Sequence, residues 1–216
     1  MRAFVSFSLV LALVGCEDPA DSVPAAEVAR SAATETPSAA PAAEAAATET
    51  LTLSPTQTTV AFVGSKVTGS HDGGFRDFTG TIAFDPAAPE RSRIEVTIQT
   101  ASLFVDNDDL AEHLKSPDFF AVEQFPTARF ESTEIRAGGE GNATHTITGR
   151  LTLHGQTQTI AFPANVTVSD ESVRATSEFS IDRTQFGMVY PGRADDLIRD
   201  RVVIKLDLTA PRASRS

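Results

Sequence analysis

Apolar and polar residues alternate with a period of two along most of residues 58–210 of this chain. The pattern is clearest in six runs, at residues 78–84, 93–99, 146–153, 160–168, 173–181 and 201–208. Such alternation gives each strand one apolar and one polar face, as in an antiparallel sheet with one buried side. Turn-forming residues separate the runs at Asp72-Gly73-Gly74, Asp85-Pro86, Gly138-Gly139 and Ser169-Asp170. The pattern predicts an all-β fold, a closed antiparallel β-barrel of about eight strands around an apolar interior.

One segment interrupts the alternation. Residues 106–115 carry Leu110 and Leu114 one helical turn apart, with an aspartate or asparagine at 106–108 that can cap the first turn. Pro117 then prevents the helix from continuing. The sequence therefore predicts a single short helix, whose two leucines seal one end of the barrel or line a path into it.

The aromatic composition favours a soluble barrel. Residues 51–210 hold 12 of the 14 phenylalanines, and the chain has no Trp and a single Tyr. A membrane-spanning barrel instead carries girdles of aromatic residues at both interfaces. The net charge of −11 argues against a nucleic-acid partner, which needs a basic face. No nucleophile motif, phosphate-binding loop or metal-ligand spacing of the four histidines occurs, so neither an enzyme nor a metal site is predicted.

The N-terminal region has a different composition. Residues 1–15 join Arg2 to an apolar run shorter than the roughly 20 residues that span a bilayer, which predicts a secretory signal peptide. The run ends in Leu13-Val14-Gly15-Cys16, which resembles a bacterial lipobox and predicts that Cys16 is lipidated. The alternative is an ordinary signal peptide with a chance cysteine.

Residues 16–50 are predicted to form a disordered tether, because residues 17–50 contain 13 alanines, four prolines and no aromatic residue. Residues 51–210 then form the barrel domain, and residues 211–216 form a tail. These segments predict a protein of the bacterial cell envelope that faces the periplasm and is attached to a membrane through its lipid anchor.

Four stretches, in order, resemble the YceI-like family of lipocalin-like periplasmic barrels that bind polyisoprenoids. The strongest runs from His113-Leu114-Lys115-Ser116-Pro117-Asp118-Phe119-Phe120 to Phe125-Pro126 and Phe130-Glu131-Ser132. The other three are residues 75–85 (FRDFTGTIAFD), 149–157 (GRLTLHGQT) and 179–187 (FSIDRTQFG).

The resemblance implies that the barrel binds a long-chain polyisoprenoid of the quinone or polyprenyl phosphate type, as a carrier, buffer or sensor, and it allows a homodimer. No other cofactor is implied. The alternative is a structural or interaction lipoprotein whose barrel is filled by its own phenylalanines. The residues expected to form the apolar lining of a lipid site are Phe62, Phe78, Ile82, Phe84, Leu110, Leu114, Phe119, Phe120, Phe130, Phe179 and Phe186.

Overall fold

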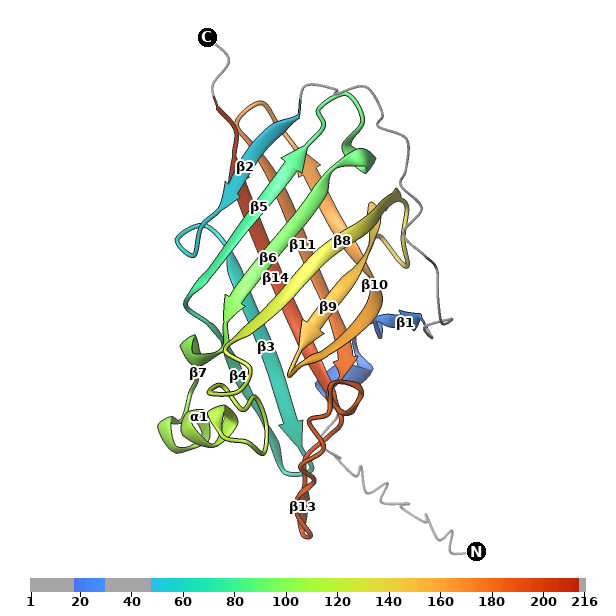
Figure 1. Cartoon of the computed structure of the whole chain (residues 1–216). Coiled ribbons are helices and arrows are strands. Elements are labelled where there is room, and N and C mark those ends of the chain that lie inside the picture. Colours follow the sequence, from blue (N-terminus) through green and yellow to red (C-terminus); the bar gives the residue numbers. More distant parts are fainter. Residues whose placement is uncertain (1–17, 30–47, 214–216) are drawn as a thin grey trace, which may run out of the picture.

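The computed structural model describes residues 18–29 and 48–213. Twelve strands form one sheet, in the order β2-β5-β6-β8-β9-β10-β11-β14-β3-β4-β7, with β1 paired to β10 (Figure 1). Their bounds are β1 Glu27–Ala29, β2 Glu49–Leu53, β3 Thr59–Lys66, β4 Gly69–Phe75, β5 Phe78–Phe84, β6 Arg93–Gln99, β7 Leu103–Val105, β8 Thr127–Ala137, β9 His145–Leu153, β10 Gln156–Val168, β11 Ser172–Asp182 and β14 Arg201–Pro211. A separate small hairpin joins β12 (Gly192–Arg193) to β13 (Asp196–Leu197). The 3-10 helices are η1 Pro19–Asp21, η2 Pro89–Arg91, η3 Thr100–Ser102 and η4 Arg183–Phe186.

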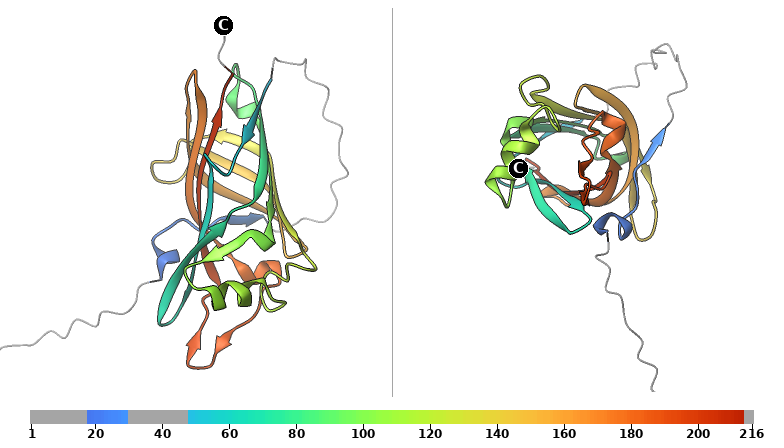
Figure 2. Two further views of the ribbon diagram at one scale, coloured as in Figure 1. Left: turned by 90° about the vertical axis from the view of Figure 1, so that its left-hand side faces the viewer. Right: turned by 90° about the horizontal axis from the view of Figure 1, so that it is seen from below.

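All the strand pairings within this sheet are antiparallel, and the sheet curls around an apolar interior, so the all-β prediction is confirmed (Figure 2). The six alternating runs became β5, β6, β9, β10, β11 and β14. Ile147 of β9 stands opposite Phe162 of β10, and both are buried in the central core cluster. One face of each long strand therefore points inward, as the alternation requires.

The strand count and the closure of the barrel differ from the predicted closed barrel of about eight strands. The sheet has twelve strands, and its path ends at β2 and β7, with no ladder between them among the described residues. At the β2 edge of the sheet, the guanidinium of Arg212, the residue after β14, donates two hydrogen bonds to the Glu49 carboxylate, at 2.8 and 2.9 Å. The hydrogen bond from Arg212 to Glu49 raises the pKa of Arg212, so the guanidinium stays charged at this edge of the sheet.

Strand β4 lies where the sequence predicted a turn. Asp72-Gly73-Gly74 pair with β3 on one side, and the two glycines also pair with β7 on the other. A Cβ on Gly73 would come within 2.5 Å of the Phe62 ring and 2.6 Å of Val105. These glycines are present because neighbouring side chains and backbone lie directly against the strand, a reason that local sequence patterns do not reveal.

The predicted short helix is confirmed as α1, Asp108–Lys115, which lies beside β7 at the lower end of the barrel in Figure 1. Asn107 is its N-cap, and the Asn107 side-chain oxygen accepts a hydrogen bond of 2.8 Å from the Leu110 amide. The helix ends at Lys115, before Ser116 and Pro117. None of the helices in the described residues is both long and apolar enough to cross a membrane.

Residues 18–29 contradict the prediction of a disordered tether over residues 16–50. Strands β10 and β11 pair only over residues 165–168 and 173–176, and the N-terminal segment occupies the place beside their lower halves. Val28 pairs with Ile160 of β10, while the Ala26 amide and the Pro24 carbonyl bond to the backbone of Ser180 in β11. The segment therefore forms part of the barrel wall, because it satisfies backbone groups that the diverging strands would leave unpaired.

The signal peptide, Cys16 and residues 30–47 of the predicted tether lie outside the described residues. Predictions that concern them stay predictions.

Candidate functional site

An apolar cavity of about 450 Å³ lies inside the curled sheet. That volume falls within the roughly 300–1,000 Å³ typical of small-molecule sites. Its walls come from opposite sides of the barrel, with Ile94, Val96 and Ile98 of β6 on one side and Ile204 and Leu206 of β14 on the other.

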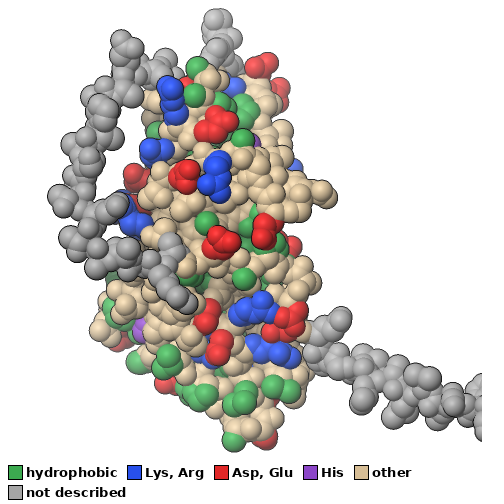
Figure 3. Space-filling view, turned by 90° about the vertical axis from the view of Figure 1, so that its right-hand side faces the viewer, with side chains coloured by type: hydrophobic (Ala, Val, Ile, Leu, Met, Phe, Trp, Pro, Cys, Tyr) green, Lys and Arg blue, Asp and Glu red, His purple; other side chains and the backbone are tan. Residues whose placement is uncertain are grey.

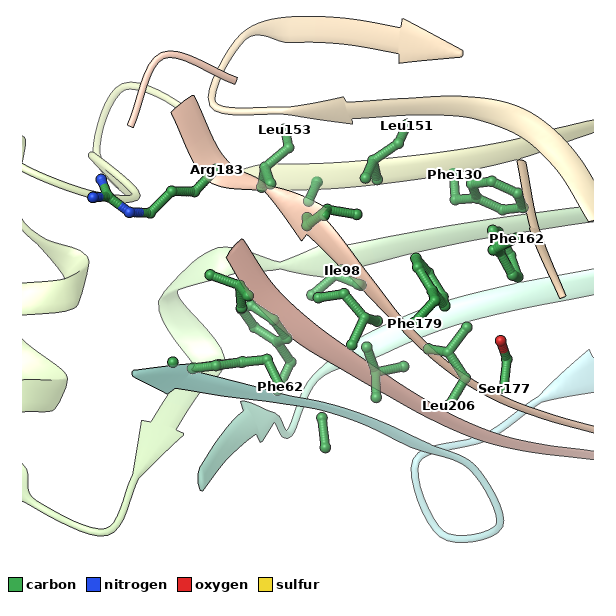
Figure 4. Close-up of a pocket in the computed structure, with 18 of the residues that line it drawn as sticks. Phe62, Ile98, Phe130, Leu151, Leu153, Phe162, Ser177, Phe179, Arg183 and Leu206 are labelled. Carbon is green, nitrogen blue, oxygen red and sulfur yellow. The ribbon is translucent and has the colours of Figure 1, made fainter. Parts of the chain in front are cut away.

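Aromatic rings line the deeper part of the cavity (Figure 4). The rings of Phe162 and Phe179 stack at 4.3 Å with an interplanar angle of 8°, and Phe130 lies 5.7 Å from Phe162. Gly149 gives the Phe130 ring its place, because a Cβ on Gly149 would lie 2.4 Å from that ring. The one hydroxyl drawn among these rings, that of Ser177, donates its hydrogen bond to the Pro163 carbonyl. The deep wall therefore presents carbon and offers no free donor from Ser177.

Several inward-facing side chains are only half-buried, although they lie inside the barrel. Leu151, Ile204 and Leu206 belong to this group, and all three line the cavity. In a filled core, further side chains would cover these three residues. Here each of them borders the cavity, so its accessible surface faces the barrel interior. This distribution is typical of a binding site and differs from a packed core, in which such residues lose nearly all of their accessible surface.

The cavity opens at the lower end of the barrel and closes at the upper end. Its upper lining includes Ile94, Ala164 and Leu208, each less than one-tenth exposed. At the lower end it is lined by Lys66 and Asn107, which are partly or fully exposed. We call this lower opening the mouth. It lies between α1, the β3–β4 turn and the loop that carries the β12–β13 hairpin.

Polar side chains gather at the mouth. The Lys66 ammonium bonds to the Asp196 carboxylate, whose oxygens also accept bonds of 2.9 and 3.0 Å from the Thr68 hydroxyl. The bond from Lys66 is the main cause that lowers the pKa of Asp196. His71 also lines the cavity, and its Nδ1 lies 2.8 Å from a carboxylate oxygen of Asp106.

Arg183 is the buried charge of the mouth, with its side chain only 5% exposed. Its guanidinium donates to the carbonyls of Met188, Arg199 and Ile198, and it pairs with Asp200 at 3.0 Å. Desolvation lowers the pKa of Arg183, although the nearby Asp200 and Asp182 carboxylates oppose that shift. Arg183 thus fixes the loop of the β12–β13 hairpin at the mouth.

The structure places seven of the eleven predicted lining residues on the cavity wall. They are Phe62, Leu110, Leu114, Phe119, Phe120, Phe130 and Phe179.

Phe78, Ile82, Phe84 and Phe186 are buried but do not line the cavity, so the structure does not support their placement in its lining. Ile82 and Phe84 pair with Leu51 and Glu49 of β2 at the upper end. There the barrel is filled, and the Arg212 guanidinium lies 5.2 Å from the centre of the Phe84 ring. Phe186 is fully buried on η4, where its carbonyl lies 3.1 Å from His154 Nδ1.

Sequence reasoning did not single out several lining residues. Phe162, Leu151, Ile204 and Leu206 all belong to runs whose alternation was recognised, so their inward direction was predictable but their height along the barrel was not. Lys66, His71 and Arg183 carry no local motif that predicts a common mouth.

The remaining histidines contribute to packing and hydrogen bonding. The His113 ring contacts Phe119 and Tyr190, each at 5.2 Å between ring centres, and the His154 ring lies 4.6 Å from that of Phe125. Within residues 18–29 and 48–213, no three His, Cys, Asp or Glu side chains are grouped to hold a metal ion.

Comparison with known proteins adds to this geometry. The model of the YceI-like domain matches residues 51–210. A UPF0312 protein of Pseudomonas savastanoi is 45% identical over 92 residues, which are 43% of this chain and 47% of its own length. This chain therefore spans about half the length of the curated relatives it matches.

Solved structures show the same fold. BcnA of Burkholderia cenocepacia superposes with a TM-score of 0.64 at 25% identity, over 73% of this chain and 99% of BcnA. A polyisoprenoid binding domain from Saccharophagus degradans, implicated in plant cell wall breakdown, superposes with a TM-score of 0.60 at 16% identity, over 76% of this chain and 98% of that domain.

Proposed function

Because the chain belongs to the YceI-like family, we propose that its cavity binds the hydrocarbon chain of a polyisoprenoid lipid. The observation that carries the proposal is the cavity of about 450 Å³, which is lined by carbon along its depth and has its charged side chains at one end. This division matches a ligand with a long apolar chain and a polar head. The solved neighbour that is itself a polyisoprenoid binding domain supports the same class of ligand.

The cavity volume sets the length of chain that can be enclosed. An apolar cavity of about 150 Å³ accommodates one benzene ring, so 450 Å³ accommodates on the order of 18 carbon atoms, or about four isoprene units. At about 0.8 kcal/mol per buried carbon, 18 carbons would contribute about 14 kcal/mol before the costs of ordering a flexible chain and of association. That total lies below the ceiling of about 20 kcal/mol for non-covalent affinity. A longer polyisoprenoid therefore extends its remaining units to the mouth or beyond.

The head group, of the quinone or polyprenyl phosphate type, then lies near Lys66 and His71 at the mouth. The Lys66 ammonium has three donors, and its hydrogen bond to Asp196 uses one of them. Arg183 is a weaker candidate for direct contact, because three carbonyls and Asp200 already accept from its guanidinium. The chain would act as a carrier, buffer or sensor of the lipid and as a binding protein, not as an enzyme.

The same proposal places the protein on a membrane of the bacterial cell envelope, facing the periplasm, through acylation of Cys16. Its support is the lipobox-like Leu13-Val14-Gly15-Cys16 and the single cysteine of the chain. Cys16→Ser removes the only acceptor thiol, so the variant should lose the acyl mass and leave the membrane fraction, or stay uncleaved. A mature-length Cys16→Ser chain that still fractionates with membranes would refute the anchor.

Extraction of the purified native protein with organic solvent, followed by mass spectrometry, tests the binding proposal. We expect about one prenyl lipid per chain. The alternative, a structural lipoprotein without a ligand, predicts no prenyl lipid in the extract and no uptake of added geranylgeranyl lipid.

A further inference from the structure

Apolar side chains are exposed together at the mouth end of the barrel. The large hydrophobic residues that lie exposed in the described part of the chain are Val67, Val189, Leu197 and Val168. The first three belong to the β3–β4 turn and to the loop of the β12–β13 hairpin, and the Val67 amide bonds to the Leu197 carbonyl at 3.1 Å. We call Val67, Val189 and Leu197 the mouth tip. Val168 lies at the other end, as the last residue of β10.

The hairpin carries the mouth tip beyond the rest of the barrel. In Figure 1 β13 is the lowest element of the coloured chain, below α1 and the end of β3. Figure 3 shows hydrophobic side chains gathered at this lower end, with charged side chains above them and an acidic side chain beside the lowest of them. Near the mouth, Lys66 pairs with Asp196 and Arg199 pairs with Asp18. The hairpin itself carries the exposed Arg193 and Asp195, so the apolar side chains of the mouth tip stand among charged ones. Such a mixture of apolar and charged side chains suits the interfacial layer of a bilayer.

The N-terminal segment begins at the same end. Asp18 lies beside the mouth, where its carboxylate accepts from the Ser65 hydroxyl at 3.3 Å and pairs with Arg199 at 3.5 Å. Asp21 pairs with Arg201, and Ala20 is buried against Val63 and Val203. Cys16 precedes Asp18 by two residues, which span at most about 7 Å. An acyl anchor on Cys16 would thus hold the mouth at the membrane surface, and not at the end of a long flexible tether.

We propose that the mouth tip inserts into the lipid bilayer, so that the cavity opens directly onto the membrane to which the protein is anchored. The inference rests on the proposed anchor and explains how an apolar chain enters the cavity without crossing water. The occupant of this surface is a bilayer held by apolar contact, since the net charge of −11 gives no attraction to anionic lipid. Insertion should therefore persist at 0.5 M salt, which screens exposed charges.

The test measures which end of the anchored protein touches lipid. With Cys16 acylated, a cysteine introduced by Ala194→Cys, in the hairpin turn, or by Asp170→Cys, in the β10–β11 turn, is the only free thiol. Each variant is labelled with an environment-sensitive dye in vesicles of phosphatidylethanolamine and phosphatidylglycerol that contain brominated acyl chains. We expect the dye at 194 to be quenched at least threefold more strongly than the dye at 170. Equal quenching, or stronger quenching at 170, would overturn the proposal.

Matched charge variants separate insertion from simple proximity. Val189→Asp with Leu197→Asp should abolish the quenching at 194, whereas Val168→Asp at the far end should leave it unchanged. Ala20→Asp should detach the docked segment and reduce the quenching at 194 while the acyl anchor stays in the vesicle. Quenching at 194 that survives the double variant would contradict insertion. Cross-linking between tips of two copies, without quenching, would show that a second chain and not lipid covers this surface.

Two separate measurements distinguish a chain without the acyl anchor from a mouth tip that does not insert. The intact mass shows whether Cys16 is acylated. If it is not, the chain from Glu17 with an N-terminal hexahistidine is held on vesicles that contain a nickel-chelating lipid, and the same two dyes are compared. A tip that is quenched in this arrangement supports the orientation without the acyl group, and an unquenched tip refutes it.

Discussion

Substitution of Leu151 by Trp should close the lipid site while the barrel stays folded. Leu151 points into the cavity in Figure 4 and is half-buried because it borders that space. One added aromatic ring needs about 150 Å³, roughly a third of the 450 Å³ present. Excluding about six carbons of ligand removes about 5 kcal/mol of transfer free energy, and partial rearrangement of the chain leaves an expected loss of at least 100-fold in affinity.

Ile82→Trp is the matched control in the filled upper end. Ile82 is 5% exposed and does not line the cavity, so the larger side chain must displace its neighbours. Overpacking of this kind costs about 1–3 kcal/mol. For a chain of this size that corresponds to a lowering of Tm by about 2–12 °C.

The two variants are compared by thermal melting and by the prenyl-lipid content of the purified proteins. Leu151→Trp should melt within about 2 °C of the delipidated wild type and contain no lipid. Ile82→Trp should melt lower and keep its lipid. If Leu151→Trp is destabilised as strongly as Ile82→Trp and lipid is absent from the wild type as well, the space at Leu151 is part of a self-filled core and the reasoning fails.

Three further outcomes concern the mouth. Arg183→Ala leaves three backbone carbonyls without their donor, which should cost about 1–3 kcal/mol and increase amide exchange of residues 188–198. Arg183→Lys should not restore protection from exchange, because lysine lacks the planar guanidinium with its several donors. Leu114→Ala should lower the free energy of unfolding by about 2 kcal/mol in urea titrations, since Leu114 packs against the cluster of Phe62, Leu103 and Ala111; a change within about 0.5 kcal/mol would place α1 outside the core. Because Lys66 lowers the pKa of Asp196, this pair stabilises the hairpin at pH values above the ordinary aspartate pKa of 3.8 and loses that effect as pH falls through the lower folded value. Amide exchange at Val67, corrected for its intrinsic pH dependence, should therefore rise in that acid window in the wild type and stay flat in Asp196→Asn.

The elements that the sequence predicted are those whose local pattern agrees with their place in the fold. Strands β5, β6, β9, β10, β11 and β14 each alternate over at least seven residues, and α1 has a cap, an apolar pair and a proline beyond its end. Strand β4 was missed because its glycines are required by contacts with Phe62 and Val105, which are distant in sequence. Residues 18–29 were missed because a polar, alanine-rich segment gains its order from the gap between β10 and β11 and not from its own propensity.

The sequence predicted which side chains of the candidate site face the barrel interior, but it did not predict their height along the barrel. Alternation shows that Ile82 and Phe179 both face inward, yet only Phe179 borders the cavity. The difference arises from β2, whose Leu51 and Leu53 fill the upper end beside Ile82 and Phe84. Which part of a barrel is filled and which part is open depends on such non-local packing, so a period of two in one strand cannot reveal it.

Photochemical cross-linking with a geranylgeranyl probe that carries a diazirine near the end of its chain tests the central claim most directly. The account predicts one adduct per chain, on the peptides that contain Phe130, Phe162 and Phe179, and its loss in Leu151→Trp. Adducts spread over outward-facing residues of the barrel, or none on these three peptides, would contradict a polyisoprenoid site inside the cavity.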